Sequence, residues 1–570
     1  MTAVKKVIAT GVQDFESLRA DNRFYVDKTN FIQEWWNGGD AVTLITRPRR
    51  FGKTLNLSML NCFFSKEYEN RGDLFEGLKV WKDPDLRKEQ GVWPVIFLTF
   101  AGIKGTSCQS TKVQIKKMLV RLALSYPELL RSEKLEGRER LALDQIRETM
   151  SDDDAALSLN LLSTLLEKEY GKKVLIFLDE YDTPLQEAYI NGYWKELAAF
   201  TRTMFNNTFK TNASLARAVM TGITRVSKES IFSELNNLDV VTTTSDKYAT
   251  CFGFTEPEVF QALDEQGFTE KNKVEVKAWY DGFTFGSCTD IYNPWSVTNY
   301  LDKGKLGAYW ANTSGNGLVG MLIRQGDPKI KMQFETLLAG NTLTVPIDEQ
   351  IIFEQLDILE NAIWSLLLAS GYLKVVSVGH QIEENEEDDT NLYTLAITNR
   401  EVRMMFRSMI RSWFEEGKYF GEFITSMFRG NELDMNRYMN RIAMHIFSYF
   451  DTGKGPGGSE PEKFYHGFVL GLLVDQAANY ELKSNRESGF GRYDVMLVPR
   501  KLTDTAVILE FKVLDGDDGE STLEDTAANA LKQIEEKKYE TELLARGIPE
   551  ENILKYGFAF KGKECLIRKG

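Results

Sequence analysis

Residues 43–54, TLITRPRRFGKT, decide the fold of the N-terminal part of this 570-residue chain. The run starts as an apolar strand, continues through a basic loop and ends in the first turn of a helix. A strand, a tight loop and a helix in this order are typical of a phosphate-binding loop, because N–H groups at a helix N-terminus attract anions. Gly52 would let the backbone approach a phosphate oxygen, Lys53 would supply an ammonium group, and Thr54 a hydroxyl ligand for Mg²⁺. We therefore expect a nucleotide site here.

One position departs from the usual G-x-x-x-x-G-K-[ST] pattern, because Arg47 stands where the first glycine is expected. Pro48, Arg49 and Arg50 follow it. The alternative interpretation is a basic loop that matches the pattern by chance. If the loop does bind phosphate, Arg49 and Arg50 could neutralise phosphate charge in place of some backbone contacts.

The composition limits the possible functions. The net charge is −14 and the isoelectric point is near 5.1, so nucleic-acid binding would need a local basic patch. The five cysteines are scattered without a C-x-x-C pair, and the chain has three histidines, so any metal should have oxygen ligands, as Mg²⁺ or Mn²⁺ does. No apolar run approaches the ~20 residues of a membrane helix. We expect a cytoplasmic protein with no membrane partner.

The order of elements predicts an α/β protein in three parts. Short apolar runs alternate with helical stretches between residues 40 and 250, which is typical of a parallel sheet. The expected strands are 41–46, 95–100, 174–178 and 215–221, and the expected helices include 111–124 and 155–170. The predicted domains are 1–250, a mainly helical middle region at 251–450 with a small hairpin around the acidic run 383–389, and 451–570. The boundary before the last domain is the Gly- and Pro-rich segment DTGKGPGGSEPE, 451–462.

A second part of the nucleotide site is expected at VLIFLDEYDTP. Asp179 follows the apolar run at the carboxyl end of a strand and would hold Mg²⁺, and Glu180 would orient or deprotonate the attacking water. A plain pair of acids at a strand end is the alternative. Asp182 is a weaker candidate, since Asp before Thr-Pro is equally a turn or a helix cap. Thr221 and Arg225 would contact the γ-phosphate, or else form an ordinary turn.

The motifs FYVDKTNFI, LITRPRRFGKTLNLSML, VLIFLDEYD, TGITRVSK and WYDGFTFG…IYNPWSVTNYL, within residues 5–300, resemble the AAA-ATPase-like family of bacterial and archaeal proteins. The resemblance implies a P-loop ATPase, with Lys53 and Thr54 in the phosphate loop and Asp179 and Glu180 at the metal and water positions. It also makes Arg47 an expected variant. The segment around Tyr25, Asp27 and Lys28 would either pack near the nucleotide base or hold the N-terminal segment.

A second constellation lies near the C-terminus. Asp494 is on the expected strand GRYDVMLVPR, and Glu510 and Lys512 are on AVILEFKV, which should form a hairpin with it. Residues two apart on a strand face the same side, so two carboxylates and an ammonium would meet in a site suited to a divalent metal and phosphodiester hydrolysis. Surface ion pairs are the alternative, but the neighbouring apolar residues make unpaired charges costly there.

This ordered set resembles the PD-(D/E)xK nuclease superfamily over about residues 455–565. The resemblance implies a restriction-endonuclease-like α/β domain, with Glu462 as an additional acidic metal ligand and Gln533 as a supporting polar residue. Lys483, Arg486 and Arg492 could form a basic patch beside Asp494, although solvated surface is the simpler interpretation.

The combined prediction is an ATP-binding protein, an ATPase with Mg²⁺ or Mn²⁺, coupled to a metal-dependent nuclease-like domain that acts on DNA or RNA. The catalytic candidates are Glu180, Asp494, Glu510 and Lys512. A rival hypothesis is a nucleotide-dependent signalling or scaffold switch whose nuclease-like domain binds without cutting. Either protein could be a homo-oligomer.

Overall fold

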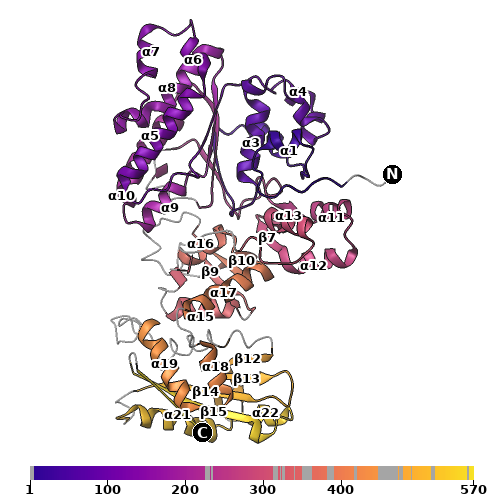
Figure 1. The fold of residues 1–570 in the computed structure, drawn as a ribbon, viewed down its shortest axis with the longest axis vertical. Coiled ribbons are helices and arrows are strands. Elements are labelled where there is room, and N and C mark those ends of the chain that lie inside the picture. The colour runs from indigo at the N-terminus through magenta and orange to yellow at the C-terminus, as the bar shows by residue number, and fades with distance from the viewer. Residues whose placement is uncertain are drawn as a thin grey trace. The chain divides into compact units, whose positions relative to one another are not determined.

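The structure is a computed structural model of the whole chain, and Figure 1 gives its fold. It describes residues 5–224, 231–232, 235–311, 319–320, 322–323, 328–338, 340–348, 362–381, 390–415, 420–446, 473, 479–488, 491–514, 520–561 and 564–570. The chain forms two compact units, unit 1 with Met1–Val319 and Thr344–Val402, and unit 2 with Gly320–Leu343 and Arg403–Gly570. The predicted boundaries near residues 250 and 450 stay predictions. Over the described part of the chain, no helix combines the length and apolarity needed to cross a membrane.

A five-stranded parallel sheet forms the centre of unit 1, as predicted. Its strands are β1 (Val42–Thr46), β2 (Val95–Thr99), β3 (Val174–Asp179), β4 (Leu215–Gly222) and β5 (Leu238–Val241). They lie in the order β2-β3-β4-β1-β5, and every neighbouring pair is parallel. The carboxyl ends of β1, β3 and β4 therefore meet at one edge of the sheet. The strand β5 was not among the strands predicted from the sequence.

Helices cover both faces of this sheet (Figure 1). Alternation along the strands separates two cores: Leu44 and Ile176 belong to one cluster, and Ile45 and Phe177 to the other. The first core is filled by α5 (Cys108–Leu124), α8 (Asp152–Tyr170) and α10 (Trp194–Phe205), and the second by α2 (Asn30–Gly38) and α3 (Lys53–Phe64). The shorter helices here are α1 (Phe15–Ala20), α4 (Pro84–Arg87), α6 (Pro127–Arg131), α7 (Gly137–Leu143) and α9 (Thr183–Ile190).

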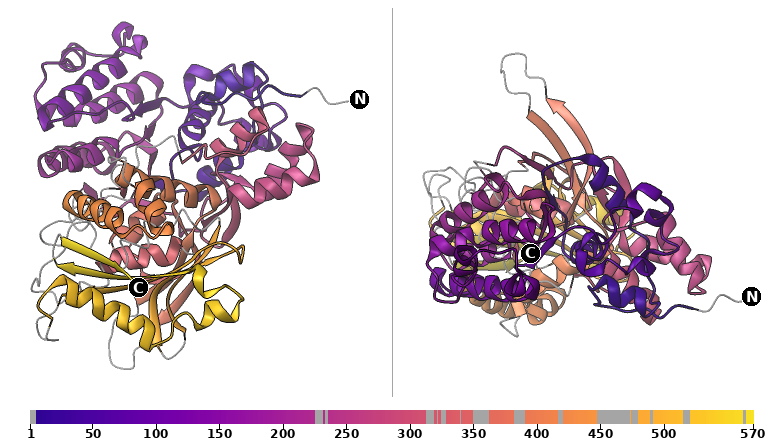
Figure 2. Two further views of the ribbon diagram at one scale, coloured as in Figure 1. Left: turned by 60° about the horizontal axis from the view of Figure 1, so that its bottom comes forward. Right: turned by 90° about the horizontal axis from the view of Figure 1, so that it is seen from above.

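The rest of unit 1 is a mixture of helices and two small sheets. One sheet has the order β6-β8-β7 and the other β10-β11-β9. The elements are β6 (Phe254–Thr255), α11 (Glu256–Glu265), α12 (Glu270–Tyr280), β7 (Asp281–Phe285), β8 (Cys288–Tyr292), α13 (Pro294–Lys303), β9 (Leu343–Pro346), α16 (Ala362–Ala369), β10 (Leu373–Gln381) and β11 (Thr390–Ile397). The long strands β10 and β11 run side by side as an antiparallel ribbon (Figure 2), as the predicted hairpin requires. The acidic run 383–389 lies outside the described residues.

Unit 2 is built on a mixed five-stranded sheet in the order β12-β13-β14-β15-β16. The predicted hairpin is the antiparallel pair β13–β14, and β14 then pairs in parallel with β15. The elements of this unit are α15 (Pro328–Leu338), α18 (Phe420–Phe428), α19 (Glu432–Ile446), β12 (Tyr480–Ser488), β13 (Gly491–Pro499), β14 (Ala506–Val513), α21 (Leu523–Glu536), α22 (Thr541–Ala545), β15 (Ile553–Lys561) and β16 (Glu564–Lys569). The helix α17 (Arg400–Glu415) contributes its first residues to unit 1 and the others to unit 2. The predicted fold class is thus confirmed in both units.

The edge strand β16 is covered by the side chains of α19. Asn440 donates to the carbonyl oxygen of Cys565 and accepts from its N–H, and Asn436 does the same for Ile567. Residues four apart lie on one helix face, so the two amides meet alternate residues of the strand. Backbone groups that would otherwise form an open sheet edge are satisfied in this way.

Candidate nucleotide site and nuclease-like site

The loop between β1 and α3 has the backbone of a tight anion-binding turn. Gly52 is the N-cap of α3 with φ +82°, and Arg50 also has a positive φ of +64°. A Cβ atom on Gly52 would meet nothing within 4 Å, so glycine is needed here for its backbone angle and not for space. The N–H groups of residues 50–54 make no hydrogen bond to any other part of the described chain. Such N–H groups at a helix N-terminus are suited to an anionic ligand.

Lys53 is buried beneath this loop. Its Nζ atom donates to the carbonyl oxygens of Arg47 and Pro48, each at 2.8 Å. Burial lowers the pKa of Lys53 to about 8, against the opposing attraction of nearby carboxylates. An ammonium group has three donors, so one remains for a further oxygen acceptor.

Asp179, at the end of β3, joins the phosphate loop to β4. Its Oδ2 accepts from Thr54 Oγ1 at 2.8 Å and its Oδ1 from Thr221 Oγ1 at 2.6 Å. Asp179 is 1% exposed, and burial raises the pKa of its carboxyl group. Four of the predicted site residues, three of them buried, therefore converge from one helix and two strand ends: Lys53, Thr54, Asp179 and Thr221.

Glu180 follows at a strained position, with φ +51°. Its N–H lies 3.5 Å from Thr221 Oγ1, and its Oε2 accepts from Thr183 Oγ1 at 3.1 Å. Non-glycine residues with positive φ are uncommon, and they cluster at functional sites. The side chain is half-buried beside the Asp179 carboxylate. Its role as the residue that orients water stays a prediction.

Asp182 has a role that the sequence only partly indicated. It occupies the N-cap position of α9, but its side chain does not cap that helix. Its Oδ2 instead accepts the N–H groups of Ile223 and Thr224, at 2.9 and 3.0 Å. The carboxylate therefore fixes the segment after β4 that leads to Arg225, and Arg225 itself lies outside the described residues.

The structure explains the absence of the first glycine. Arg47 is fully buried, and its guanidinium group turns away from the loop to donate to the carbonyl oxygens of Thr242 and Lys247. It also lies over the ring of Phe285, with 4.5 Å from Cζ to the ring centroid. Burial lowers the pKa of Arg47 to about 9. Arg47 is thus an anchor for the start of the loop, and not a group that faces a ligand.

Arg49 and Arg50 are both exposed at the surface of the loop. The Arg50 guanidinium lies over the ring of Trp295 at 4.4 Å, and Arg49 Nη2 is 3.4 Å from Gln186 Oε1. Their charge-neutralising role stays a prediction.

The segment FYVDKTNFI serves to hold the N-terminal part of unit 1. Lys28 is 5% exposed and donates to Glu258 Oε2 at 2.6 Å and to the carbonyl oxygen of Thr250 at 2.8 Å. Asp27 accepts from the N–H of Lys79 at 2.8 Å. The two charged residues therefore join distant parts of unit 1, which agrees with the second of the two predicted alternatives.

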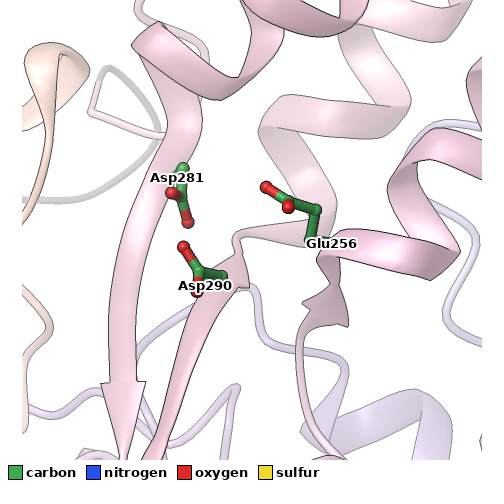
Figure 3. A group of neighbouring side chains, drawn as sticks. All are labelled: Glu256, Asp281 and Asp290. Atoms are coloured by element: carbon green, nitrogen blue, oxygen red, sulfur yellow. The ribbon is translucent and has the colours of Figure 1, made fainter.

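A carboxylate cluster that the sequence did not indicate joins the first residue of α11, the first residue of β7 and a residue within β8 (Figure 3). The side chains of Glu256, Asp281 and Asp290 point toward one another, with one oxygen of each within 4.8 Å of the others. Burial and Asp290 raise the pKa of Asp281 to about 6. Lys277 forms ion pairs with all three acids. The cluster is thus already partly neutralised by an internal cation.

In unit 2, Asp494 on β13 and Glu510 on β14 are neighbours across the hairpin. The Asp494 Oδ2 accepts from the N–H of Phe511 at 2.8 Å, and the Asp494 N–H lies 3.4 Å from Glu510 Oε2. Glu510 is 2% exposed, whereas Asp494 and Lys512 are half-buried. The structure therefore brings the two predicted acids together, with Lys512 two residues along the same strand.

Gln533 on α21 orients Glu510, as the sequence suggested. Its Nε2 donates to Glu510 Oε1 and lies 3.2 Å from the hydroxyl of Tyr539, a residue that the sequence analysis missed. Glu462 lies outside the described residues, as do the side chains of Arg486 and Arg492. Lys483 is buried and paired with Glu542, so its charge is already taken up inside unit 2.

Comparison with known proteins agrees with both parts of the chain. Residues 9–232 match the AAA-ATPase-like family model, described as a predicted AAA-ATPase, and residues 460–570 match the model of the PD-(D/E)XK nuclease superfamily. The two predicted resemblances are therefore confirmed, with one model matched in the N-terminal part of the chain and the other in the C-terminal part. An uncharacterized protein of the vnfD 5′ region of Azotobacter chroococcum mcd 1 is 25% identical over 572 residues, which cover 96% of this chain and 95% of that protein.

Proposed function

We propose that unit 1 binds ATP at the loop between β1 and α3. The observation that carries this proposal is the convergence of Lys53, Thr54, Asp179 and Thr221 beside a row of N–H groups that have no partner among the described residues. The N–H groups and the ammonium would hold phosphate oxygens. The net charge of −14 gives the chain no general attraction for anions, so affinity for ATP would come from these local groups.

The same residues fit a divalent cation. Thr54 and Asp179 present hydroxyl and carboxylate oxygens, which are the ligands that Mg²⁺ prefers. Bound there, Mg²⁺ would neutralise charge on the phosphates. Glu180, on the next residue, would accept a proton from water, and Thr221 would hold the Asp179 carboxylate in place. These roles make unit 1 an ATPase.

The test of ATP binding is calorimetry with Lys53→Ala and with Lys88→Ala, which alters an exposed lysine that pairs with Asp85. We expect the first variant to lose measurable affinity for Mg·ATP and the second to bind like the unchanged protein. Equal binding by Lys53→Ala would refute the phosphate-loop assignment.

We also propose that unit 2 hydrolyses phosphodiester bonds. Asp494 and Glu510 supply adjacent carboxylates for Mg²⁺ or Mn²⁺, and such an ion would activate water and stabilise the phosphate charge. Lys512 would orient the water or the phosphate. Nucleotide binding in unit 1 would control this activity, since one chain carries both sites.

The test is incubation of single- and double-stranded DNA and RNA with the full chain, with each metal and with or without ATP. Glu510→Gln and Lys512→Ala should abolish cleavage, and Lys532→Ala, on the exposed side of α21, should retain it. The rival, a switch whose C-terminal domain binds without cutting, is favoured by the internal pairing of Lys483, which removes one charge from the predicted basic patch. Binding without cleavage under every condition would support that rival.

A further inference from the structure

The phosphate loop of unit 1 is held from outside by residues far along the chain. The indole N–H of Trp310 donates to the carbonyl oxygen of Arg49 at 3.0 Å, and Asn293 Nδ2 lies 3.4 Å from the same oxygen. Two residues later, the N–H of Gly253 donates to the carbonyl oxygen of Phe51 at 3.3 Å. Alternate carbonyl groups of the loop are thus turned toward these three residues.

These contacts also fix the direction of two N–H groups of the loop, those of Arg50 and Gly52. In a trans peptide, the C=O of one residue and the N–H of the next point in opposite directions. Because Arg49 C=O points to Trp310 and Asn293, the N–H of Arg50 points away from them. Because Phe51 C=O points to Gly253, the N–H of Gly52 points away in the same manner. Neither N–H donates to another residue of the described chain.

Trp310 and Asn293 are themselves held in place by their neighbours. Trp310 is 2% exposed, packs against the rings of Phe283 and Tyr372, and donates its backbone N–H to Glu401 Oε1 at 2.6 Å. Asn293 caps α13 through its Oδ1, which accepts from the N–H groups of residues 295 and 296. Side chains held in this way have little freedom to follow the loop, so they can set its shape.

We propose that Trp310 and Asn293 are positioning residues of the nucleotide site, which aim the N–H groups of Arg50 and Gly52 at the phosphates. Their bonds to the loop replace the conformational control that a glycine at position 47 would otherwise give. The proposal rests on the ATP-binding function proposed above. It assigns to residues 293 and 310 a part in substrate affinity that lies outside the phosphate-loop motif.

Two conservative variants test the proposal in the full chain. Trp310→Phe removes the indole donor and keeps an aromatic ring, and Asn293→Asp keeps an oxygen for the α13 cap but removes the amide donor. Trp279→Phe is the matched control, because that indole packs against Arg400 and, among the described residues, forms no hydrogen bond with the loop. The first readout is hydrogen exchange of the backbone amides of residues 47–56 without nucleotide. The second is the Kd and the KM for Mg·ATP.

We expect faster exchange in residues 47–56 for both variants and a roughly five-fold rise in Kd and KM for each, the effect of one lost hydrogen bond. The kcat of ATP hydrolysis should change little, and the control should match the unchanged protein.

Unchanged exchange together with unchanged Kd would overturn the proposal. If the unchanged protein fails to bind ATP while loop exchange still rises in the variants, the proposed function is wrong. The contacts of Trp310 and Asn293 with the loop would then have a structural role alone. A loss of kcat at constant KM would also contradict a positioning role. Thermal unfolding of each variant shows whether it is still folded. If Trp310→Phe is not, the result for Asn293→Asp, which keeps the α13 cap, decides the outcome.

Discussion

Thr54 and Asp179 are joined directly, with Thr54 Oγ1 donating to Asp179 Oδ2 at 2.8 Å although 125 residues separate them. This bond connects the helix after the phosphate loop to the end of β3. The hydroxyl and the carboxylate are thus already at the distance at which one cation could bind both, or water could bridge them.

Replacing Thr54 tests its hydrogen bond to Asp179 and its proposed role as a Mg²⁺ ligand separately. Thr54→Val removes the hydroxyl, so the buried Asp179 keeps one of its two hydroxyl donors. We expect the free energy of unfolding to fall by about 1–3 kcal/mol. Mg²⁺ should no longer strengthen ATP binding, as measured by the Kd with Mg²⁺ and with a chelator. Thr54→Ser, which retains the hydroxyl, is the control, and a Val variant that still responds to Mg²⁺ would contradict the metal role.

The depressed pKa of Lys53 predicts how nucleotide affinity depends on pH. Burial lowers this pKa from 10.5 to about 8, so the ammonium form declines in the free protein above pH 8. The affinity for ATP should therefore be constant near pH 7 and fall above pH 8, by up to ten-fold per pH unit. Titrations from pH 6.5 to 9.5 measure this change. Lys53→Arg, which stays charged, should bind more weakly with a flat profile.

The lowered pKa of Lys53 has the opposite effect on the stability of the folded protein, which should rise with pH. Between about pH 8 and 10.5 the unfolded chain binds more protons at Lys53 than the folded chain does. The contribution of this lysine to stability therefore rises with pH across that window.

Glu401 predicts a pH dependence of stability. Burial raises its pKa from 4.5 to about 7, and its acceptor bonds with Ser296, Trp310 and Ala311 oppose that rise. The folded chain thus binds more protons than the unfolded chain between pH 4.5 and 7, so stability falls as pH rises through that range. Glu401→Gln should weaken this dependence and raise the unfolding temperature at pH 8. An unchanged slope from pH 5 to 8.5 would argue against it.

Replacing Gln533 should weaken the binding of metal by unit 2. Its amide donates to Glu510 Oε1, and partners of this kind fix the orientation of a ligand carboxylate. Gln533→Leu should lower Mn²⁺ affinity about 10–100-fold, measured by calorimetry. Lys532→Ala, one residue away and exposed, should bind Mn²⁺ normally. If Gln533→Leu binds as well as the unchanged protein, Gln533 has no role in holding metal.

Removing a side-chain amide of α19 should lower the stability of the protein. Asn440→Leu would leave the N–H and the carbonyl oxygen of Cys565 without their present partner. We expect a cost of about 1–3 kcal/mol in urea unfolding. Asn529→Leu, which removes an exposed amide bond to Glu520, should change stability much less. Similar values for the two variants would mean that the edge of β16 does not depend on this amide.

Local sequence was sufficient for the parts of the fold that local chemistry determines. The strand 174–178 was predicted one residue short of β3, Val174–Asp179, because a continuous apolar run before an acid marks a buried strand end. The strand AVILEFKV, which carries Glu510 and Lys512, was predicted with the bounds of β14, because a short apolar run rich in β-branched residues is typical of a buried strand. The short strand β5, Leu238–Val241, was missed, since four residues with one acid carry little periodicity.

The destination of a long side chain could not be predicted in this way. Arg47 was assigned to a phosphate loop by its position in a motif, but its guanidinium lies among the carbonyl groups of residues 242–247. Trp310 and Asn293 gave no signal of their contact with Arg49, because it depends on how segments some 250 residues apart pack. Such contacts are tertiary, and no pattern in the neighbouring sequence encodes them.

The dependence of the loop on Trp310 has a practical consequence for shortened forms of the protein. A fragment that stops near residue 250 would contain every residue of the phosphate-loop motif, yet it would lack Asn293, Trp310 and the Glu401 carboxylate that holds Trp310. Its loop would be free to adopt other shapes, and weak nucleotide binding by such a fragment would say nothing about the intact chain. The smallest piece with a complete site should extend beyond residue 401.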